Sequence, residues 1–158
     1  MSERSFPAVP GSYLLWLYLP RATQISIGRL GRYHCRRGWY FYCGSAFGPG
    51  GLRARLDHHL RRSEKRHWHI DYLKEWADIR AVWLCRGSNR EHDWSRLLME
   101  LENAEWPVPG FGSSDRECRS HLVYLPKRPA AGNVRNLLTG DCRIEPYNLP
   151  RGLPSPLC

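Results

Sequence analysis

A length of 158 residues, with an ordinary balance of apolar and charged side chains, indicates one soluble globular domain. The net charge of +9 and the pI of about 9.6 favour a polyanionic partner, most often nucleic acid; the alternative is a basic protein with no such partner. No stretch approaches the ~20 apolar residues that span a membrane, and residues 1–10 lack the hydrophobic region of a signal peptide. We therefore expect a cytoplasmic protein with no membrane partner.

The number and spacing of the cysteines agree with the expected cytoplasmic location. Six cysteines are scattered along the chain without any C-x-x-C pair, and in a reducing environment they are most simply free thiols. Two of them, Cys43 and Cys85, lie in apolar runs where cysteine behaves as a small hydrophobic residue. We therefore expect no disulfide.

Three stretches in the first part of the chain are predicted to be strands. The run Leu14–Leu19 is continuously hydrophobic, which suits a central strand covered on both faces. Ile25–Ile27 alternates and predicts a short strand, followed by turns at Gly28 and Gly31. Trp39–Cys43 predicts a strand that pairs with the first.

A glycine-rich loop, residues 47–51, leads into an amphipathic helix. Leucines spaced four apart within residues 52–60 form its core stripe. Arg55 and His59, also four apart, lie one turn above the other beside that stripe. Strand, loop and helix therefore deliver a tyrosine, an arginine and a histidine to one place, which we interpret as a phosphodiester site.

A basic connector, residues 61–66, follows this helix. It is either a solvated loop, which most charge runs are, or a contact with the phosphate backbone. The residues predicted to bind nucleic acid are Arg53, Arg61, Arg62, Lys65, Arg66, His67 and His69.

The next helix is predicted to begin near His67 and to run to about Trp76. His67, His69 and Asp71 are spaced i, i+2, i+4, which does not place all three on one helix face, so a zinc site built only from them is disfavoured. Either this helix start packs under the sheet, with His69 bonded to the backbone, or His67 or His69 lines the groove of Arg55.

The second half of the chain alternates again. Ile79–Cys85 is predicted to be a strand, and a helix from about Arg90 to Asn103 follows, capped by Ser88 or Asn89. Prolines and glycines make residues 107–115 a loop, in which Ser113, Ser114 and Asp115 either border the site or simply cap the loop. His121–Leu125 is predicted to be the last strand.

Apolar residues become sparse from Lys127 onward. We expect a proline-rich, mostly irregular tail over residues 127–158, with a turn of helix at Asn133–Leu138. Residues 9–126 form the domain, a small α/β (α+β) fold in which about three helices flank a mostly antiparallel sheet.

Two short motifs, Gly11-Ser12-Tyr13 and Tyr42-Cys43-Gly44, resemble the half-motifs of the GIY-YIG nuclease superfamily, which lie on neighbouring strands. Arg55 and His59 match the arginine and the histidine or tyrosine that this family carries four residues apart on the following helix. The resemblance implies that the family's single acidic residue, at or within a later helix, is Glu91.

Glu100 is the alternative for that acidic residue. Residues 67–73, 108–115 and 118–122 are similar to one branch of the superfamily, the Uri-type proteins long catalogued only as a domain of unknown function. The resemblance covers about residues 9–126.

The sequence departs from the family pattern at several positions. Ser12 and Cys43 replace the central isoleucines, and the wide spacing of the half-motifs implies an extra hairpin around Ile25. Ser45 stands where repair nucleases often have a lysine, so one cation directed at phosphate is missing. Arg116 replaces the first cysteine of a Cys-x-Cys pair, which weakens any metal site at Cys118 and His121.

The resemblance implies hydrolysis of a phosphodiester bond. Glu91 would hold Mg²⁺ (or Mn²⁺), which polarises the phosphate and stabilises the leaving oxygen. Arg55 would hold the phosphate, and Tyr13 or Tyr42 would orient or deprotonate the water. His59 would act as a hydrogen-bond partner or proton carrier.

We therefore expect a metal-dependent endonuclease acting on nucleic acid, with DNA the expected substrate. Each residue also has a structural interpretation: the tyrosines as core, Arg55 as a surface arginine, Glu91 as a first-turn charge of a helix. Two other functions stay open. One is a non-catalytic nucleic-acid-binding module that keeps the nuclease fold, which Ser45 favours, and the other is a structural or protein-interaction domain.

Overall fold

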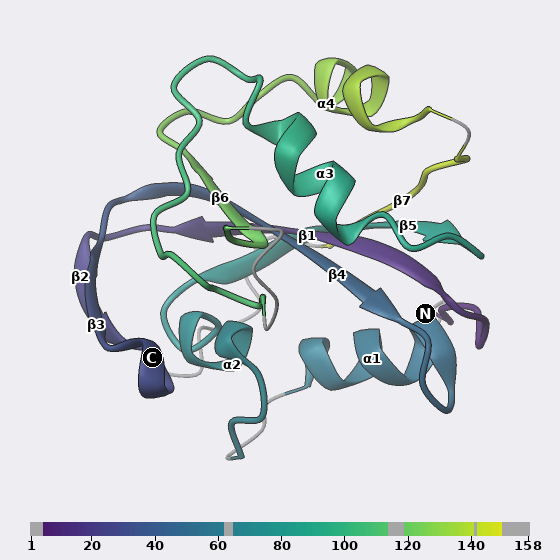
Figure 1. Ribbon diagram of the computed structural model, residues 1–158, viewed down its shortest axis with the longest axis horizontal. Coiled ribbons are helices and arrows are strands. Elements are labelled where there is room, and N and C mark those ends of the chain that lie inside the picture. Colours follow the sequence, from purple (N-terminus) through teal and green to yellow (C-terminus); the bar gives the residue numbers. More distant parts are fainter. Residues whose placement is uncertain (1–4, 62–64, 114–118, 141, 150–158) are drawn as a thin grey trace.

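The structure is a computed structural model that describes residues 5–61, 65–113, 119–140 and 142–149. Figure 1 shows its elements along the chain. In chain order they are β1 (Gly11–Leu19), β2 (Thr23–Ser26), the 3-10 helix η1 (Gly28–Leu30), β3 (Arg32–Cys35), β4 (Gly38–Ala46), α1 (Gly51–Leu60), α2 (His69–Leu73), β5 (Asp78–Arg86), α3 (Glu91–Leu98), β6 (Leu122–Leu125), α4 (Ala131–Leu138) and β7 (Glu145–Asn148).

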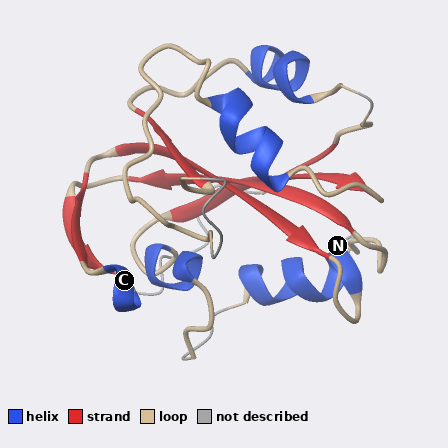
Figure 2. Ribbon diagram, viewed as in Figure 1, coloured by secondary structure: helices blue, strands red, loops and turns tan. Residues whose placement is uncertain are grey.

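The fold is α+β, as predicted. Five strands form one antiparallel sheet in the order β6-β4-β1-β5-β7, and β2 and β3 form a separate two-stranded hairpin. Helices α1 and α2 lie on one side of the main sheet, and α3 and α4 lie on the other (Figures 1 and 2). The expected pairing of the first strand with Trp39–Cys43 and the expected hairpin around Ile25 are both confirmed.

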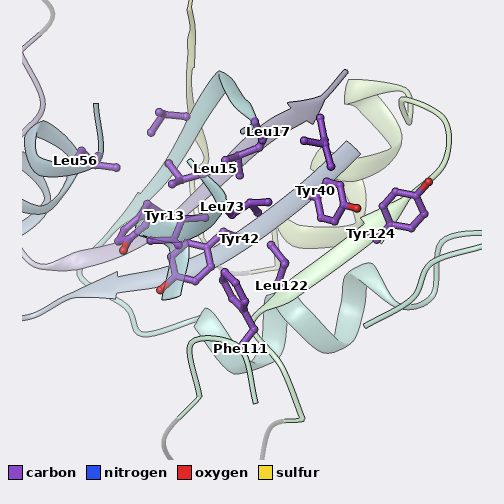
Figure 3. Packing of buried hydrophobic residues seen from close by; sticks show 14 of the residues in the cluster. Tyr13, Leu15, Leu17, Tyr40, Tyr42, Leu56, Leu73, Phe111, Leu122 and Tyr124 are labelled. Atoms are coloured by element: carbon purple, nitrogen blue, oxygen red, sulfur yellow. The ribbon is translucent and has the colours of Figure 1, made fainter. Parts of the chain in front are cut away.

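β1 lies at the centre of the sheet because both of its faces are apolar. Tyr13, Leu15 and Leu17 pack into the cluster under α1 and α2, part of which Figure 3 shows. Leu14 and Trp16 point the other way, into the cluster under α3 and α4. Since successive side chains of a strand alternate between faces, a continuous apolar run serves two cores at once.

The glycines of the two short motifs allow close packing around β1. Gly44 pairs with Tyr13 across the strands, and a Cβ atom on Gly44 would lie 2.3 Å from Cζ of the Tyr13 ring. A Cβ atom on Gly11 would lie 2.3 Å from the carbonyl oxygen of Cys85. Both positions therefore require the absence of a side chain, which places the Tyr13 ring directly against the backbone of β4.

Two helices are shorter than predicted. α2 ends at Leu73, and turns follow as far as Ala77. α3 begins after Arg90 and ends at Leu98, five residues before Asn103, which has a positive φ of 64°. Residues 99–104 make turn hydrogen bonds instead, because Glu105 must reach Tyr124 to form a β-bridge.

The turn of helix expected at Asn133–Leu138 is confirmed and lies within α4, but the expectation of a mostly irregular tail is wrong for its described part. α4 has eight residues, and β7 pairs with β5 at the edge of the sheet. Val134, Leu138 and Ile144 are buried in the cluster under α3 and α4. Although apolar residues are few here, their spacing places them on one face of α4, which composition alone does not reveal.

The expectation of free thiols is wrong for two cysteines. Cys85 and Cys142 form a disulfide, with Cα atoms 6.1 Å apart. They are separated by 57 positions in sequence, and only the packing of the tail beside β5 brings them together. Cys35 and Cys43 are buried thiols, and burial raises the pKa of Cys35 to about 11.

Within the described ranges, none of the helices combines the length and the apolar character that crossing a membrane requires.

The contact between Tyr13 and Gly44 predicts a difference between two glycine substitutions. Gly44→Ala should lower the free energy of unfolding by about 1–3 kcal/mol, because the added methyl group collides with a buried ring. Gly132→Ala is the matched control: Gly132 is exposed in α4 with open space around its Cα. That change should stabilise the protein by about 0.5–1 kcal/mol through helix propensity. Urea denaturation measures both, and equal effects would contradict the packing argument.

Candidate functional site

Two tyrosines from neighbouring strands meet at one end of the main sheet. The ring centroids of Tyr13 on β1 and Tyr42 on β4 are 6.2 Å apart, and Figure 3 shows their hydroxyl oxygens at the same end of the cluster. Tyr13 Oη and His59 Nε2 lie 2.8 Å apart, and the His59 ring is also in contact range of the Tyr42 ring. The structure therefore brings together three of the four residues predicted to be catalytic.

Both tyrosines keep their protons at neutral pH. Burial raises the pKa of Tyr13 well above its ordinary value; Tyr42 adds to this effect, while the charge and hydrogen bond of Arg55 oppose it. Burial, followed by the negative charge of Glu91, raises the pKa of Tyr42. Each tyrosine can therefore donate and accept hydrogen bonds, but neither is a ready-made phenolate base.

His59 is a neutral imidazole at physiological pH. Its side chain lies on α1 and is 1% exposed. Burial, with help from the positive charge of Lys74, lowers its pKa to about 3. Its Nδ1 atom is buried and has no hydrogen-bond partner in the described part of the chain. His59 thus fits the predicted role of hydrogen-bond partner better than that of a proton carrier near neutral pH.

Arg55 completes this group from the same helix. Its guanidinium carbon lies 4.5 Å from the centre of the Trp68 ring, and the residue is half-buried beside the leucine stripe of α1. The flat ring holds the guanidinium in one orientation, because stacking and cation–π attraction both act on it. Trp68 was not among the predicted site residues. The only feature of the sequence that could have pointed to it is its position between His67 and His69.

Glu91, the predicted metal ligand, is held by two serines. Ser45 Oγ donates a hydrogen bond of 2.9 Å to Glu91 Oε2. The buried Ser12 hydroxyl accepts a 2.6 Å hydrogen bond from the N–H of Arg90 and donates another to the carbonyl of Ser88. The segment that starts α3 is therefore tied to β1 beside Tyr13. The sequence treated both serines as departures from a family pattern, whereas they position the acidic residue.

Glu100, the alternative acidic residue, does not share this environment. It is exposed and lies beyond the last residue of α3. Nine residues of helix and turn correspond to on the order of 13 Å along the axis from Glu91. The charge of Glu91 acts on the pKa values of both Tyr13 and Tyr42. The geometry favours Glu91.

Two histidines stand beside Glu91. One ligand atom from each of Glu91, His92 and His121 lies within 4.8 Å of the other two, a spacing that could hold a metal ion. Nε2 of His121 and Nδ1 of His92 are 3.1 Å apart. The sequence analysis considered His121 only as part of a metal site with Cys118, which lies outside the described residues. It did not propose His92 as a site residue, although His92 is next to Glu91 in the sequence.

The predicted nucleic-acid-binding residues do not form one uniform group. Arg53 donates to the Phe6 carbonyl and to Ser5 Oγ, and Arg66 pairs with Glu75, so these cations have internal partners. Arg61, Lys65 and His67 are exposed next to the site helix. Arg62 lies outside the described residues.

The histidines and aspartate at the start of α2 separate in the structure. The N–H of Gly112 donates a 2.8 Å hydrogen bond to Nδ1 of His69, which confirms the backbone-bonding interpretation. Asp71 turns instead toward α1, and its Oδ2 accepts hydrogen bonds from the N–H groups of His67 and Trp68. Burial alone would raise the pKa of Asp71, but these hydrogen bonds and the charge of Lys74 lower it. Asp71 is therefore an ionised cap of α2.

Ser113 is half-buried near this site, whereas Ser114 and Asp115 lie outside the described residues.

These features define an α+β domain with a polar, tyrosine-lined site at one end of an antiparallel sheet. The chain belongs to the family described as "Domain of unknown function DUF123", whose match covers residues 12–140. That match includes α4. Comparison with curated proteins and with solved structures found no match.

The two hydrogen bonds of Ser12 predict a local effect of its removal. Ser12→Ala leaves the Ser88 carbonyl and the Arg90 N–H without their partner, so the free energy of unfolding should fall by about 1–3 kcal/mol. Ser26→Ala, at an exposed strand position, should change it by less than about 0.5 kcal/mol. Thermal unfolding compares the two, and a Ser12 variant as stable as wild type would show that the hydroxyl does not hold the α3 start.

Proposed function

We propose that the protein is a metal-dependent endonuclease of the GIY-YIG type, which hydrolyses phosphodiester bonds of nucleic acid, with DNA as the expected substrate. One observation supports this above the others. Tyr13, Tyr42, Arg55, His59 and Glu91 come from four separate elements, and their contacts and charges place them at one end of the sheet. This is the set that the sequence resemblance implies.

The carboxylate of Glu91 fits a divalent cation. It is half-buried, it is ionisable, and its Oε2 is oriented by Ser45. A bound Mg²⁺ or Mn²⁺ would polarise the phosphate and stabilise the leaving oxygen. The nearby imidazoles of His92 and His121 favour Mn²⁺ over Mg²⁺, because nitrogen ligands suit the softer ion.

Arg55 supplies the fixed positive charge that faces the substrate. Stacking on Trp68 leaves the edge of the guanidinium plane for a bidentate contact with phosphate oxygens. The same charge also acts on Tyr13. Arg55 can therefore hold a phosphate near the tyrosine hydroxyl while its own orientation is fixed by a neighbour.

Tyr13 would orient the attacking water. When its O–H group donates to Nε2 of His59, a lone pair of Oη remains to accept a hydrogen from water. In this arrangement the neutral imidazole of His59 fixes the direction of the Tyr13 hydroxyl, and Tyr13 would hold the water for its attack on phosphorus.

The burial of Tyr13 supports a second candidate function. Its side chain is 0% exposed, so a substrate can reach the hydroxyl only if the covering residues move. A nucleic-acid-binding module that keeps the nuclease fold needs no such access. Exposed Arg61 and Lys65, together with the net charge of +9, would serve both functions.

Metal-dependent cleavage separates the two candidates. With Mg²⁺ or Mn²⁺, the wild-type protein should cut single-stranded, duplex or branched DNA. Arg55→Ala and Glu91→Gln should each reduce the rate by about 100-fold or more, because each removes stabilisation of transition-state charge. Glu100→Gln is the matched control, since it removes an acidic side chain just beyond the end of α3, and it should cleave normally.

Two results would contradict the nuclease proposal. If the wild type binds these DNAs but never cuts them, the binding module is the function. If Glu100→Gln abolishes cleavage while Glu91→Gln does not, the metal ligand is assigned to the wrong residue. Far-UV circular dichroism of each variant excludes unfolding as the cause.

Binding itself should depend strongly on salt. The logarithm of the association constant should fall linearly with the logarithm of the salt concentration, because each neutralised phosphate releases a counterion. Replacing the exposed Arg61 by Ala should make the slope less steep by about one unit. Fluorescence anisotropy with labelled DNA at several salt concentrations measures this, and a slope near zero would argue against an electrostatic nucleic-acid interface.

A further inference from the structure

Three side chains with buried polar atoms meet where the end of α1 meets the start of α2. The atoms are Nε2 of His58, Nδ1 of His59 and Oδ1 of Asp71, and each lacks a hydrogen-bond partner among the described residues. One ligand atom from each of these residues lies within 4.8 Å of the other two. The side chains of His59 and Asp71 are almost completely shielded from solvent. Oδ1 of Asp71 has only long ionic contacts, with Lys74 and His58, and Nδ1 of His59 has no hydrogen-bond partner among the described residues. Leaving such a buried nitrogen unsatisfied is costly, so its position beside these groups needs a cause.

The other polar atom of two of these side chains is already engaged. Nε2 of His59 lies 2.8 Å from Tyr13 Oη, and Oδ2 of Asp71 accepts the N–H groups of His67 and Trp68. Metal ligands are held in this way: one atom is free to bind and the second is oriented by a neighbour. The unsatisfied atoms are thus fixed in direction by the rest of the fold.

We propose that His58, His59 and Asp71 form a binding site for a divalent transition metal, with Zn²⁺ the best match to two imidazoles and one carboxylate. Three protein ligands leave a fourth tetrahedral position for water. His58, with 19% of its side chain exposed, gives an ion a path from solvent. The site is distinct from Glu91, and the proposal does not rest on the proposed nuclease function.

One charge acts against the ion. Nζ of Lys74 lies 3.6 Å from Oδ1 of Asp71, and Nε2 of His58 lies 3.5 Å from the same oxygen. In the metal-free protein Lys74 balances the carboxylate. A bound cation must displace this ammonium group or share the oxygen with it, so Lys74 sets the affinity of the site.

The site also reaches Tyr13. A metal on Nδ1 of His59 leaves the imidazole hydrogen on Nε2, which then donates to Tyr13 Oη. His59 in that state stabilises negative charge on the Tyr13 oxygen. If the nuclease proposal holds, zinc would act on cleavage through the position of one hydrogen atom.

Metal binding tests the site without nucleic acid. The protein, first treated with a chelator, should bind one equivalent of Zn²⁺ in calorimetric titration, and Co²⁺ should give the absorption spectrum of a tetrahedral site. His58→Ala and Asp71→Asn should weaken binding by more than about 100-fold, since even changes to outer-shell partners cost 10- to 100-fold. In Asp71→Asn, the new side chain can keep the cap of α2 through its carbonyl oxygen, while the NH2 group that replaces Oδ1 has no lone pair available to bind a metal.

Two further variants sharpen the result. His67→Ala removes an exposed histidine close to His58 and should leave affinity unchanged. Lys74→Met should tighten binding, because it removes the competing positive charge. Circular dichroism of the metal-free variants checks their folding, and His58→Ala, at a partly exposed position, keeps the test valid if Asp71→Asn does not fold.

Three outcomes would overturn the proposal. The wild type could bind no Zn²⁺, His58→Ala and wild type could bind it equally, or His121→Ala could abolish binding while His58→Ala does not. The last result would place the ion beside Glu91. Failure of DNA cleavage would leave this proposal unaffected, and failure of zinc binding would leave the nuclease proposal unaffected.

Discussion

The contact between the Tyr13 ring and the backbone of Gly44 is the constraint on which the site depends. It lets the ring lie against β4 at the end of the sheet, because no side chain can stand at Gly44 while the ring lies there. The tyrosine hydroxyl is thereby directed to His59 on α1. Ser12, the residue before Tyr13, points to the opposite face and holds the start of α3. Adjacent residues of one strand thus position functional groups on both sides of the sheet.

The shifted pKa values of the groups around this contact result more from burial, which disfavours the charged form, than from interactions with neighbouring charges. Burial is the leading cause of the raised pKa values of Tyr13 and Tyr42 and of the lowered pKa of His59. All three groups are therefore neutral at pH 7, and the charge is supplied by Arg55 and Glu91 at the border of the site. A neutral, hydrogen-bonded centre with charged groups at its edge is the arrangement that the proposed phosphate and metal binding would need.

Much of the fold was predictable from the sequence, since the apolar runs and the leucine spacing of α1 record which faces are buried. The short motifs, Arg55, His59 and Glu91 could also be placed in one unit. What could not be predicted depends on contacts between distant segments: Cys85 with Cys142, Trp68 under Arg55, and Asp71 with two histidines of another helix. Local periodicity carries no information on such pairs. The serines were misjudged for the same reason, because comparison with a motif shows what a residue replaces and not what it touches.

The strand order has a consequence for how the protein meets other molecules. β7 borders one edge of the sheet, and its second residue is Pro146, which has no N–H group to offer to a further strand. β6 borders the other edge and bonds through Tyr124 to Glu105. Both outer strands have only four residues. Short, interrupted edges resist the strand-by-strand growth that leads to aggregation, so the sheet can keep an extended, fully apolar central strand without presenting a long free edge to a second copy of the chain.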